Sequence, residues 1–210
     1  MDQPRRVERS PKHVRATLGG AYVVDSAEVR LVWVDRPYPA YWFPDADVRA
    51  DLLPAGAVRT SPGLPGLVGV DWGAVDQWYE EDEPVYVHAR DPCTRVDVLA
   101  SSRHVVVELD GVRLAESGQP RVLFETGLPP RFYLPARDAR LDLLRPSATT
   151  TMCPYKGTAT YLDAVVNGVT HRDLVWCYPA PFAESQKIAG LLCFYPDRAR
   201  LVVDGIDQST

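Results

Sequence analysis

The chain carries an internal repeat with an offset of 91 residues, and this repeat constrains the fold more than any other feature. Residues 13–66 align without a gap on residues 104–157, with 16 identities over 54 positions. Ordinary residue usage would give about three or four identities by chance. A repeated segment of this length indicates that one structural unit occurs twice. We therefore expect two tandem domains, at residues 13–103 and 104–205, each large enough for its own core.

The segments outside the repeat are expected to add little to the fold. Residues 1–12 are rich in charge and proline, which predicts a disordered lead-in, and residues 206–210 are expected to form a short tail. The first residues contain no apolar stretch of the kind that forms a signal peptide. No apolar run approaches the roughly 20 residues that span a bilayer. These features predict a cytoplasmic protein that does not associate with membranes.

Turn residues predict the class of secondary structure. The chain has 19 prolines and 14 glycines, which disfavour long helices and favour short strands. Asp110-Gly111 and Asn167-Gly168 lie between β-branched residues and predict two β-hairpins with tight turns. Only "RDARLDLL" and "FAESQKIAG" are expected to form short helical turns. The predicted fold class is mainly β, with two tandem small antiparallel β domains and few short helices.

Charge and motif content narrow the possible partners. The net charge is −5, and acidic and basic residues are mixed along the chain without a basic stripe, which argues against a nucleic-acid partner. The four cysteines show no Cys-x-x-Cys spacing, and no glycine-rich phosphate loop occurs. We therefore predict no metal and no cofactor, and a small molecule as the ligand. The repeat predicts either a monomer with pseudo-twofold symmetry or a homodimer.

Positions that are identical in both copies are interpreted as scaffold. An Asp/Arg/Asp ladder and a Leu-Leu pair occur in each copy, and we expect the ladder to form an ion-pair network around a turn. His13 and His104 are equivalent and are expected to be structural. Gly66 and Gly157 predict a backbone position that excludes a Cβ atom. The ladder comprises Asp47, Arg49 and Asp51 in the first copy and Asp138, Arg140 and Asp142 in the second.

Positions that differ between the copies are interpreted as candidates for a site. Glu125 aligns with Val34, and Arg131 aligns with Ala40. Cys153, Tyr155 and Lys156 align with Pro62, Leu64 and Pro65. Because the second copy carries polar groups where the first has apolar or rigid residues, we expect a site in the second domain. The first domain is then a degenerate copy that has lost it.

The candidate catalytic residues are Glu125, Cys153 and Lys156. An ammonium group three residues from a cysteine favours the reactive thiolate if the turn brings the two together. Glu125 is expected at a strand end, where it can act as a general acid or base. The structural alternatives remain open: Cys153 as a packed thiol, Lys156 in an ion pair, and Trp176 in the core. The candidate ligand-binding residues are Arg131, Tyr133, Thr150, Thr151, Tyr155, Trp176 and Tyr178.

Four strings in the second half resemble a known family: "ETGLPPRFYLP", "LDLLRPSATTTMCPYKGTATY", "LVWCYPAP" and "IAGLLCFYP". They are similar to the domain-of-unknown-function family numbered 427, which also carries a nucleotidyltransferase-like label. The resemblance covers residues 104–205, and the first half looks like a divergent second copy. It implies a compact fold similar to the β-tent of Mss4-like and methionine sulfoxide reductase B-like proteins. Several of those proteins bind zinc through cysteine pairs, which this chain lacks.

The resemblance also implies that the family motifs include seven of the candidates, namely Glu125, Arg131, Tyr133, Cys153, Lys156, Trp176 and Tyr178. It names no substrate. We favour an enzyme that binds a small polar metabolite in a pocket of the second domain and acts by acid–base or thiol-assisted chemistry, as a hydrolase or an isomerase. The alternative is a non-catalytic module that binds a ligand or a partner, built as an internal pseudo-dimer.

Overall fold

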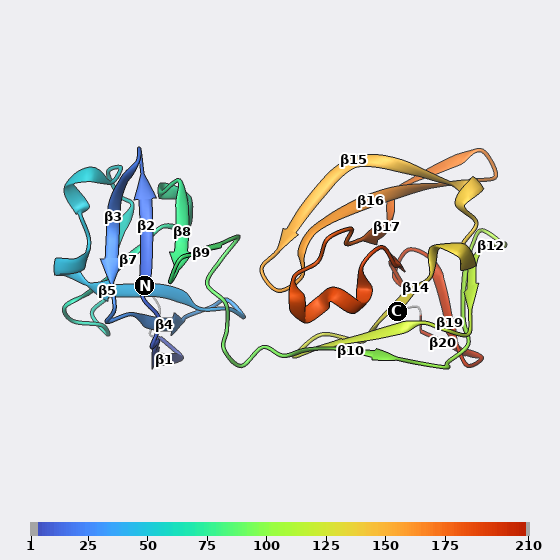
Figure 1. The fold of residues 1–210 in the computed structure, drawn as a ribbon, viewed down its shortest axis with the longest axis horizontal. Coiled ribbons are helices and arrows are strands. Elements are labelled where there is room, and N and C mark those ends of the chain that lie inside the picture. Colours follow the sequence, from blue (N-terminus) through green and yellow to red (C-terminus); the bar gives the residue numbers. More distant parts are fainter. Residues whose placement is uncertain (1–3, 209–210) are drawn as a thin grey trace. The chain divides into compact units, whose positions relative to one another are not determined.

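The computed structural model describes residues 4–208. The chain forms two units, Met1–Asp91 and Pro92–Thr210, each built from antiparallel strands. Figure 1 shows each unit as its own group of strands. The predicted class, mainly β with two antiparallel β bodies, is therefore confirmed. We call Met1–Asp91 the first unit and Pro92–Thr210 the second unit.

The first unit contains two sheets around one apolar core. Valines on β2 and β3 pack there against Phe43 and Trp78. The first sheet has the order β1 (Arg6–Arg9), β4 (Arg30–Trp33), β5 (Ala40–Pro44), β7 (Leu67–Val70) and β6 (Val58–Thr60). The second sheet has the order β3 (Ala21–Ser26), β2 (Val14–Leu18), β8 (Gln77–Glu80) and β9 (Glu83–Val85).

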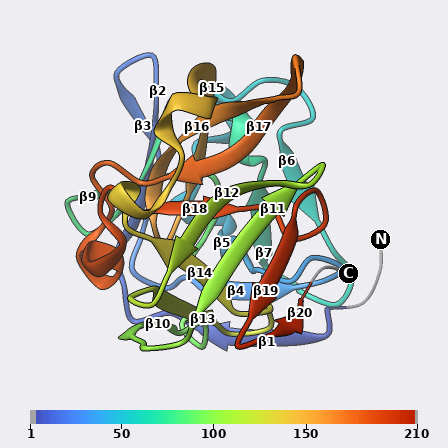
Figure 2. The same ribbon diagram turned by 90° about the vertical axis from the view of Figure 1, so that its right-hand side faces the viewer.

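The second unit repeats this plan with a larger first sheet. That sheet has the order β10 (Val96–Ala100), β13 (Arg121–Glu125), β14 (Arg131–Leu134), β18 (Leu192–Phe194), β17 (Val169–Cys177), β16 (Gly157–Val166) and β15 (Leu144–Cys153). The other sheet has the order β12 (Val112–Ser117), β11 (Val105–Leu109), β19 (Arg200–Val203) and β20 (Ile206–Asp207), and Figure 2 views it from the front. The outermost strand β15 shows an irregular register between Pro146 and Thr150.

The predicted turns occur where the sequence placed them. Asp110 and Gly111 have φ angles of 48° and 76°, and Asn167 and Gly168 have 50° and 79°, so both pairs close hairpins. The two predicted helical segments contain short 3₁₀ helices: η4 (Ala136–Asp138) and η5 (Leu141–Leu143) in the first and η6 (Ala183–Ile188) in the second. The first unit has η1 (Asp45–Asp47), η2 (Ala50–Leu52) and η3 (Trp72–Ala74). No helix among residues 4–208 is long and apolar enough to cross a membrane.

A buried serine connects the strands to the 3₁₀ turns in the same way in both units. Ser26 Oγ donates a hydrogen bond to the Asp47 carboxylate at 2.6 Å, and Ser117 Oγ donates to Asp138 at 2.7 Å. The remaining pairs of the ladder, Arg49–Asp51 and Arg140–Asp142, are ion pairs on the surface of these turns. The ladder therefore forms one ion pair in each unit rather than the predicted network, because Asp47 and Asp138 bind serine hydroxyl groups instead of the ladder arginines.

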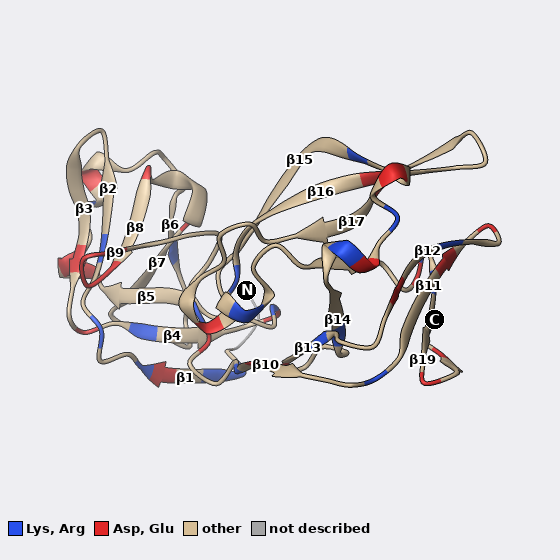
Figure 3. Ribbon diagram, turned by 45° about the vertical axis from the view of Figure 1, so that its right-hand side comes forward, with Lys and Arg blue, Asp and Glu red and all other residues tan. Residues whose placement is uncertain are grey.

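Surface charges are interspersed in both units, as Figure 3 shows. The equivalent histidines belong to this set: His13 pairs with Asp25 and His104 pairs with Glu116, each across a β-hairpin at the start of a strand. The two pairs occupy the same place in the two units. This arrangement supports the prediction that both histidines are structural.

The predicted ends of the domains need correction. Arg6–Arg9, predicted to be disordered, forms β1 and pairs antiparallel with β4, with Val7 opposite Val32. The equivalent strand β10 pairs with β13 in the second unit, although the sequence assigned it to the first domain. The boundary therefore lies at Asp91/Pro92 rather than 103/104. The predicted tail begins with the strand Ile206–Asp207.

The structure also corrects the alignment of the repeats after Leu53 and Leu144. β5 pairs with β7 and β14 pairs with β18, so β7 and β18 are equivalent. The next strand in the sheet is β6 in the first unit and β17 in the second. By position in the sheet, β15 and β16 therefore have no counterpart in the first unit. The alignment of Cys153, Tyr155 and Lys156 with residues 62–65 has no structural basis.

Gly66 and Gly157 can be compared by their backbone conformation. Both residues have positive φ, +75° and +91°, a conformation that favours glycine. A Cβ atom at Gly66 would have no heavy atom within 4 Å, and one at Gly157 would make only ordinary contacts. Backbone conformation therefore disfavours a Cβ atom at both glycines, which agrees with the prediction, and the surrounding atoms do not add to this effect.

Candidate functional site

The second unit has a cavity of about 210 Å³ beside the end of β13 and the start of β14. Strands β16 and β17 and the residue that follows β18 complete its wall. The structure brings six of the ten predicted site residues together at this cavity. These are Glu125, Arg131, Tyr133, Lys156, Trp176 and Tyr178.

An ion pair between Glu125 and Lys156 lies at one side of the cavity. The two side chains are only 10% and 11% exposed, so each is the other's main source of charge compensation. Glu125 is the last residue of β13, as predicted. Lys156 lies in the turn between β15 and β16, where Gly157 adopts its positive φ and the Phe182 N–H donates to the Lys156 carbonyl at 3.2 Å. The backbone therefore holds the ammonium group toward the cavity.

Aromatic rings form another part of the wall. Trp176 Nε1 donates a hydrogen bond to Tyr133 Oη at 3.1 Å, and the two rings meet edge to face. Tyr195 packs on Trp176 with ring centroids 4.4 Å apart. Burial strongly raises the pKa of Tyr133 and Tyr178, and burial together with Tyr161 raises the pKa of Tyr195 to about 12. These phenols therefore stay protonated at neutral pH and present hydroxyl groups to a ligand.

Arg131 supplies a second cation at the cavity. Its guanidinium group lies over the Trp176 ring, 5.9 Å from the centroid, and its side chain is half-buried. No carboxylate among residues 4–208 forms an ion pair with it at 4.0 Å or less. A guanidinium group on an aromatic face, without a carboxylate partner, is suited to bind an anionic group of a ligand.

Four predicted site residues lie outside the lining of this cavity. Cys153 is half-buried against an apolar cluster. The Lys156 ammonium group, predicted to lie beside its thiol, pairs with Glu125 instead. Thr150 is an exposed residue of β15, and Tyr155 is half-buried in the turn. Thr151 contributes indirectly, because its hydroxyl hydrogen-bonds at 2.9 Å to the hydroxyl of Tyr161, which lines the cavity.

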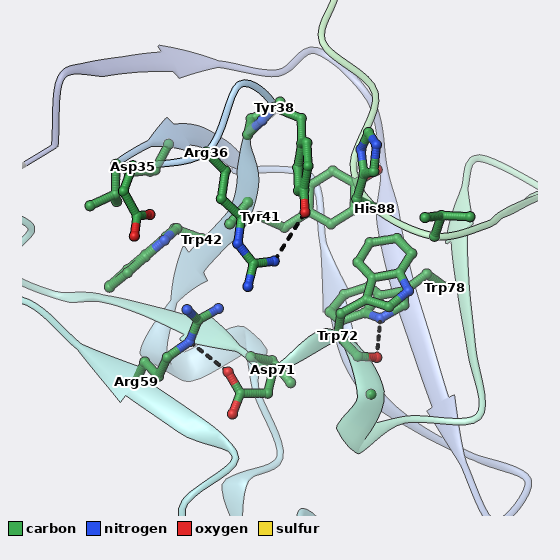
Figure 4. A pocket seen from close by; sticks show the side chains of 17 residues that line it. Asp35, Arg36, Tyr38, Tyr41, Trp42, Arg59, Asp71, Trp72, Trp78 and His88 are labelled. Carbon is green, nitrogen blue, oxygen red and sulfur yellow. Dashed lines mark hydrogen bonds and ion pairs between the residues drawn. The ribbon is translucent and has the colours of Figure 1, made fainter. Parts of the chain in front are cut away.

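The first unit has a larger cavity, of about 700 Å³, in the equivalent place. Val32, Ala40 and Trp42 line it, and their counterparts Leu123, Arg131 and Tyr133 line the cavity of the second unit. The prediction that polar lining occurs only in the second copy is therefore wrong. The first cavity is also lined by Asp35, Arg36, Arg59, Asp71 and His88 (Figure 4).

Comparison with known families gives a match that covers parts of both units. The sequence matches a family described as a domain of unknown function (DUF427), NTP_transf_9, over residues 6–63 and 97–205. The chain belongs to the DUF427 family. The predicted resemblance is confirmed, and the match also extends over the first copy. No match to a curated protein was found.

The DUF427 match covers the two cavities unequally. All the residues that line the cavity of the second unit fall within 97–205. In the first unit the match ends at residue 63, whereas Trp72, Trp78 and His88 also line the cavity. Part of the first cavity is thus built from residues outside the segment shared with the family.

Several residues of the second cavity were not predicted. Tyr161 and Tyr195 were missed, together with the apolar residues Leu123, Leu128 and Pro129. Tyr195 follows directly after the buried strand β18, and a polar aromatic residue at a strand end is a signal that could have identified it. Among residues 4–208, no three His, Cys, Asp or Glu side chains are grouped to hold a metal ion.

Proposed function

We propose that this DUF427 protein binds a small polar metabolite that carries a carboxylate group, in the cavity of the second unit. The observation that supports the proposal is the buried Glu125–Lys156 ion pair beside an aromatic wall and the Arg131 guanidinium. The cavity of about 210 Å³ is smaller than the sites of drug-sized molecules, which have about 300–1,000 Å³. A compact metabolite fits this volume.

Arg131 is the proposed anchor for the ligand carboxylate, because its planar guanidinium matches a carboxylate in two parallel hydrogen bonds. The Tyr133 hydroxyl accepts a hydrogen bond from Trp176, which leaves its own proton to donate to the ligand. The rings of Trp176 and Tyr195 shield the remainder of the ligand from water. Weak solvent screening strengthens every charge interaction in such a site.

The proposed chemistry is proton transfer next to a carbonyl group, which makes the protein an isomerase. The Glu125 carboxylate removes a proton from the carbon beside the carbonyl, and the C–H electron pair passes into an enolate. The Lys156 ammonium donates a hydrogen bond to the enolate oxygen and stabilises its charge. Return of a proton from Glu125 to the same carbon regenerates the substrate and gives hydrogen exchange only. When that carbon carries a hydroxyl group, the enolate oxygen gains a proton and the hydroxyl group loses one, and protonation of the former carbonyl carbon by Glu125 then gives the isomer without a co-reactant.

The test uses three 2-oxo acids as probes: pyruvate, 2-oxobutanoate and oxaloacetate. Proton NMR in D₂O follows the loss of hydrogen from the carbon beside the ketone. We expect the protein to accelerate exchange for at least one probe and Glu125→Gln to lower the rate by about 100-fold or more. Arg131→Gln is expected to weaken binding, whereas Arg95→Gln, at a surface arginine, is expected to change neither property. No acceleration with any probe would contradict the catalytic part of the proposal.

The second candidate is a non-catalytic binding module. One observation favours it: Glu125 and Lys156 neutralise each other, as a structural pair would. Labelling with 5-fluorotryptophan separates the candidates, because Trp176 is the only tryptophan among residues 92–210. A saturable shift of the Trp176 fluorine resonance with a probe, without hydrogen exchange, identifies binding alone.

A further inference from the structure

The cavity of the first unit differs in chemistry from that of the second. Its volume of about 700 Å³ lies within the range of sites for drug-sized molecules. The place of Glu125 is taken by Val34, and by position in the sheet Arg59 takes the place of Trp176. An ion pair like Glu125–Lys156 is therefore not built at this place, and the cavity presents arginines and aromatic rings instead.

Aromatic rings form much of its wall. Trp72 and Trp78 stack with ring centroids 5.3 Å apart and planes inclined by 21°, and Tyr41 stacks on Trp72 at 6.1 Å. Trp78 Nε1 donates to the Trp72 carbonyl at 3.1 Å, which fixes the orientation of this pair. Flat rings held in place by their neighbours are suited to stack on a flat ring of a ligand.

Two guanidinium groups extend into the cavity. Figure 4 shows Arg36 entering from the β4–β5 loop and Arg59 from the opposite side. Arg59 pairs with Asp71 at 2.8 Å, whereas Arg36 donates to the Tyr38 hydroxyl at 3.2 Å and forms no ion pair with a carboxylate among residues 4–208. Arg36 therefore has donors left for an anionic group of a ligand.

The remaining ionisable groups limit how much negative charge the cavity accepts. The carboxylates of Asp35 and Asp71 would repel a second anionic group. His88 stacks on Tyr38 with ring centroids 3.7 Å apart. Burial, and to a lesser extent the charge of Arg36, lower the pKa of His88, so it adds no positive charge at neutral pH.

We propose that this cavity is a second binding site, for a flat aromatic molecule that carries one anionic group, either a carboxylate or a phosphate. The ring stacks on the half-buried Trp72, which the buried Trp78 supports from behind, and the anionic group lies on Arg36 beside Arg59. The site is independent of the metabolite cavity in the second unit, and its ligand is of a different class. Three of the four tryptophans of the first unit, Trp42, Trp72 and Trp78, line it, whereas Trp33 does not.

The experiment titrates 5-fluorotryptophan-labelled protein with two probes, indole-3-acetate for a carboxylate and adenosine 5′-monophosphate for a phosphate. We expect at least one probe to shift the resonances of Trp72 and Trp78 saturably and to leave Trp33 and Trp176 unchanged. Arg36→Gln should weaken this binding by about tenfold or more, because it removes a charge-assisted contact. Arg49→Gln, at an exposed arginine of the same unit, is the matched control and should bind as the wild type does.

Comparison of the two probes shows whether the anionic group of the ligand is a carboxylate or a phosphate. A response to indole-3-acetate alone identifies a carboxylate ligand, and a response to adenosine monophosphate alone identifies a phosphate ligand. Neutral indole should bind more weakly than indole-3-acetate. The proposal is overturned if neither probe moves a first-unit resonance at millimolar concentration, or if Arg36→Gln binds as tightly as the wild type.

Discussion

Replacement of Lys156 by methionine should destabilise the second unit strongly. The change removes the ammonium group and leaves the Glu125 carboxylate, only 10% exposed, without its partner. Removal of one member of a buried ion pair costs about 3–5 kcal/mol. Because each side chain here retains about a tenth of its exposure, we expect the lower end, about 3 kcal/mol. This corresponds to about a hundredfold change in the ratio of folded to unfolded second unit.

The assay is urea unfolding followed by fluorine NMR of protein labelled with 5-fluorotryptophan. Trp176 reports on the second unit, and the other four tryptophans report on the first. We expect Lys156→Met to lower the urea midpoint of the Trp176 resonance and to leave the midpoints of the other four unchanged. The double variant Glu125→Val/Lys156→Met should recover most of the lost stability of the second unit, because a well-packed apolar pair can replace a buried ion pair at little cost. Valine is chosen because Val34 occupies the equivalent place in the first unit.

A surface pair provides the control. Arg140 and Asp142 are 2.6 Å apart but exposed, so Asp142→Asn should leave the urea midpoint of Trp176 nearly unchanged. The reasoning is refuted if Lys156→Met shifts the midpoint no more than this control does. It is also refuted if the losses of the two single variants simply add in the double variant.

Three further predictions test other parts of the structure. Ser26→Ala and Ser117→Ala should each cost about 1–3 kcal/mol, each only in its own unit, because both remove the same buried hydrogen bond to an aspartate; unfolding measured unit by unit checks this. Since the folded state lowers the pKa of His88, the unfolded first unit binds an extra proton below about pH 6.5, so its stability should fall as the pH drops below that value. His88→Gln should remove that part of the pH dependence, and an unchanged slope would contradict the assignment. Cys153→Ala should leave probe binding at the second cavity unchanged, because the thiol lies outside its lining; a loss of binding in titrations would return Cys153 to the site.

The sequence predicted the parts of the fold that depend on local signals. Tight turns at Asp110-Gly111 and Asn167-Gly168 follow from the positive φ angles that these residues tolerate, and the alignment of the copies identified the ladder of each 3₁₀ turn. β1 was missed because Arg6–Arg9 alternates charged and apolar residues over only four positions, and its pairing with β4 depends on long-range contacts. A short edge strand of this kind has too few residues for a recognisable sequence pattern.

The site was predicted in part, for a reason that the repeat makes clear. Glu125, Arg131 and Tyr133 lie where the two copies are truly equivalent, so comparison of the copies was informative there. Cys153 ends β15 and Lys156 lies in the turn between β15 and β16. The sheet of the first unit has no strand at the positions of β15 and β16, and only Lys156 of these two residues reaches the cavity. The cavity of the first unit was missed for two reasons: Trp72, Trp78 and His88 lie beyond residue 66, where the alignment ends, and Arg36 and Arg59 lie within it but the comparison looked for polar groups in the second copy only.

The irregular register of β15 has a consequence for association between chains. β15 is the outermost strand of a seven-stranded sheet, so one side of its backbone is open to a strand from another molecule. Pro146 has no N–H to donate, and the break between Pro146 and Thr150 interrupts the flat edge. Both features disfavour the addition of a further strand along this part of β15.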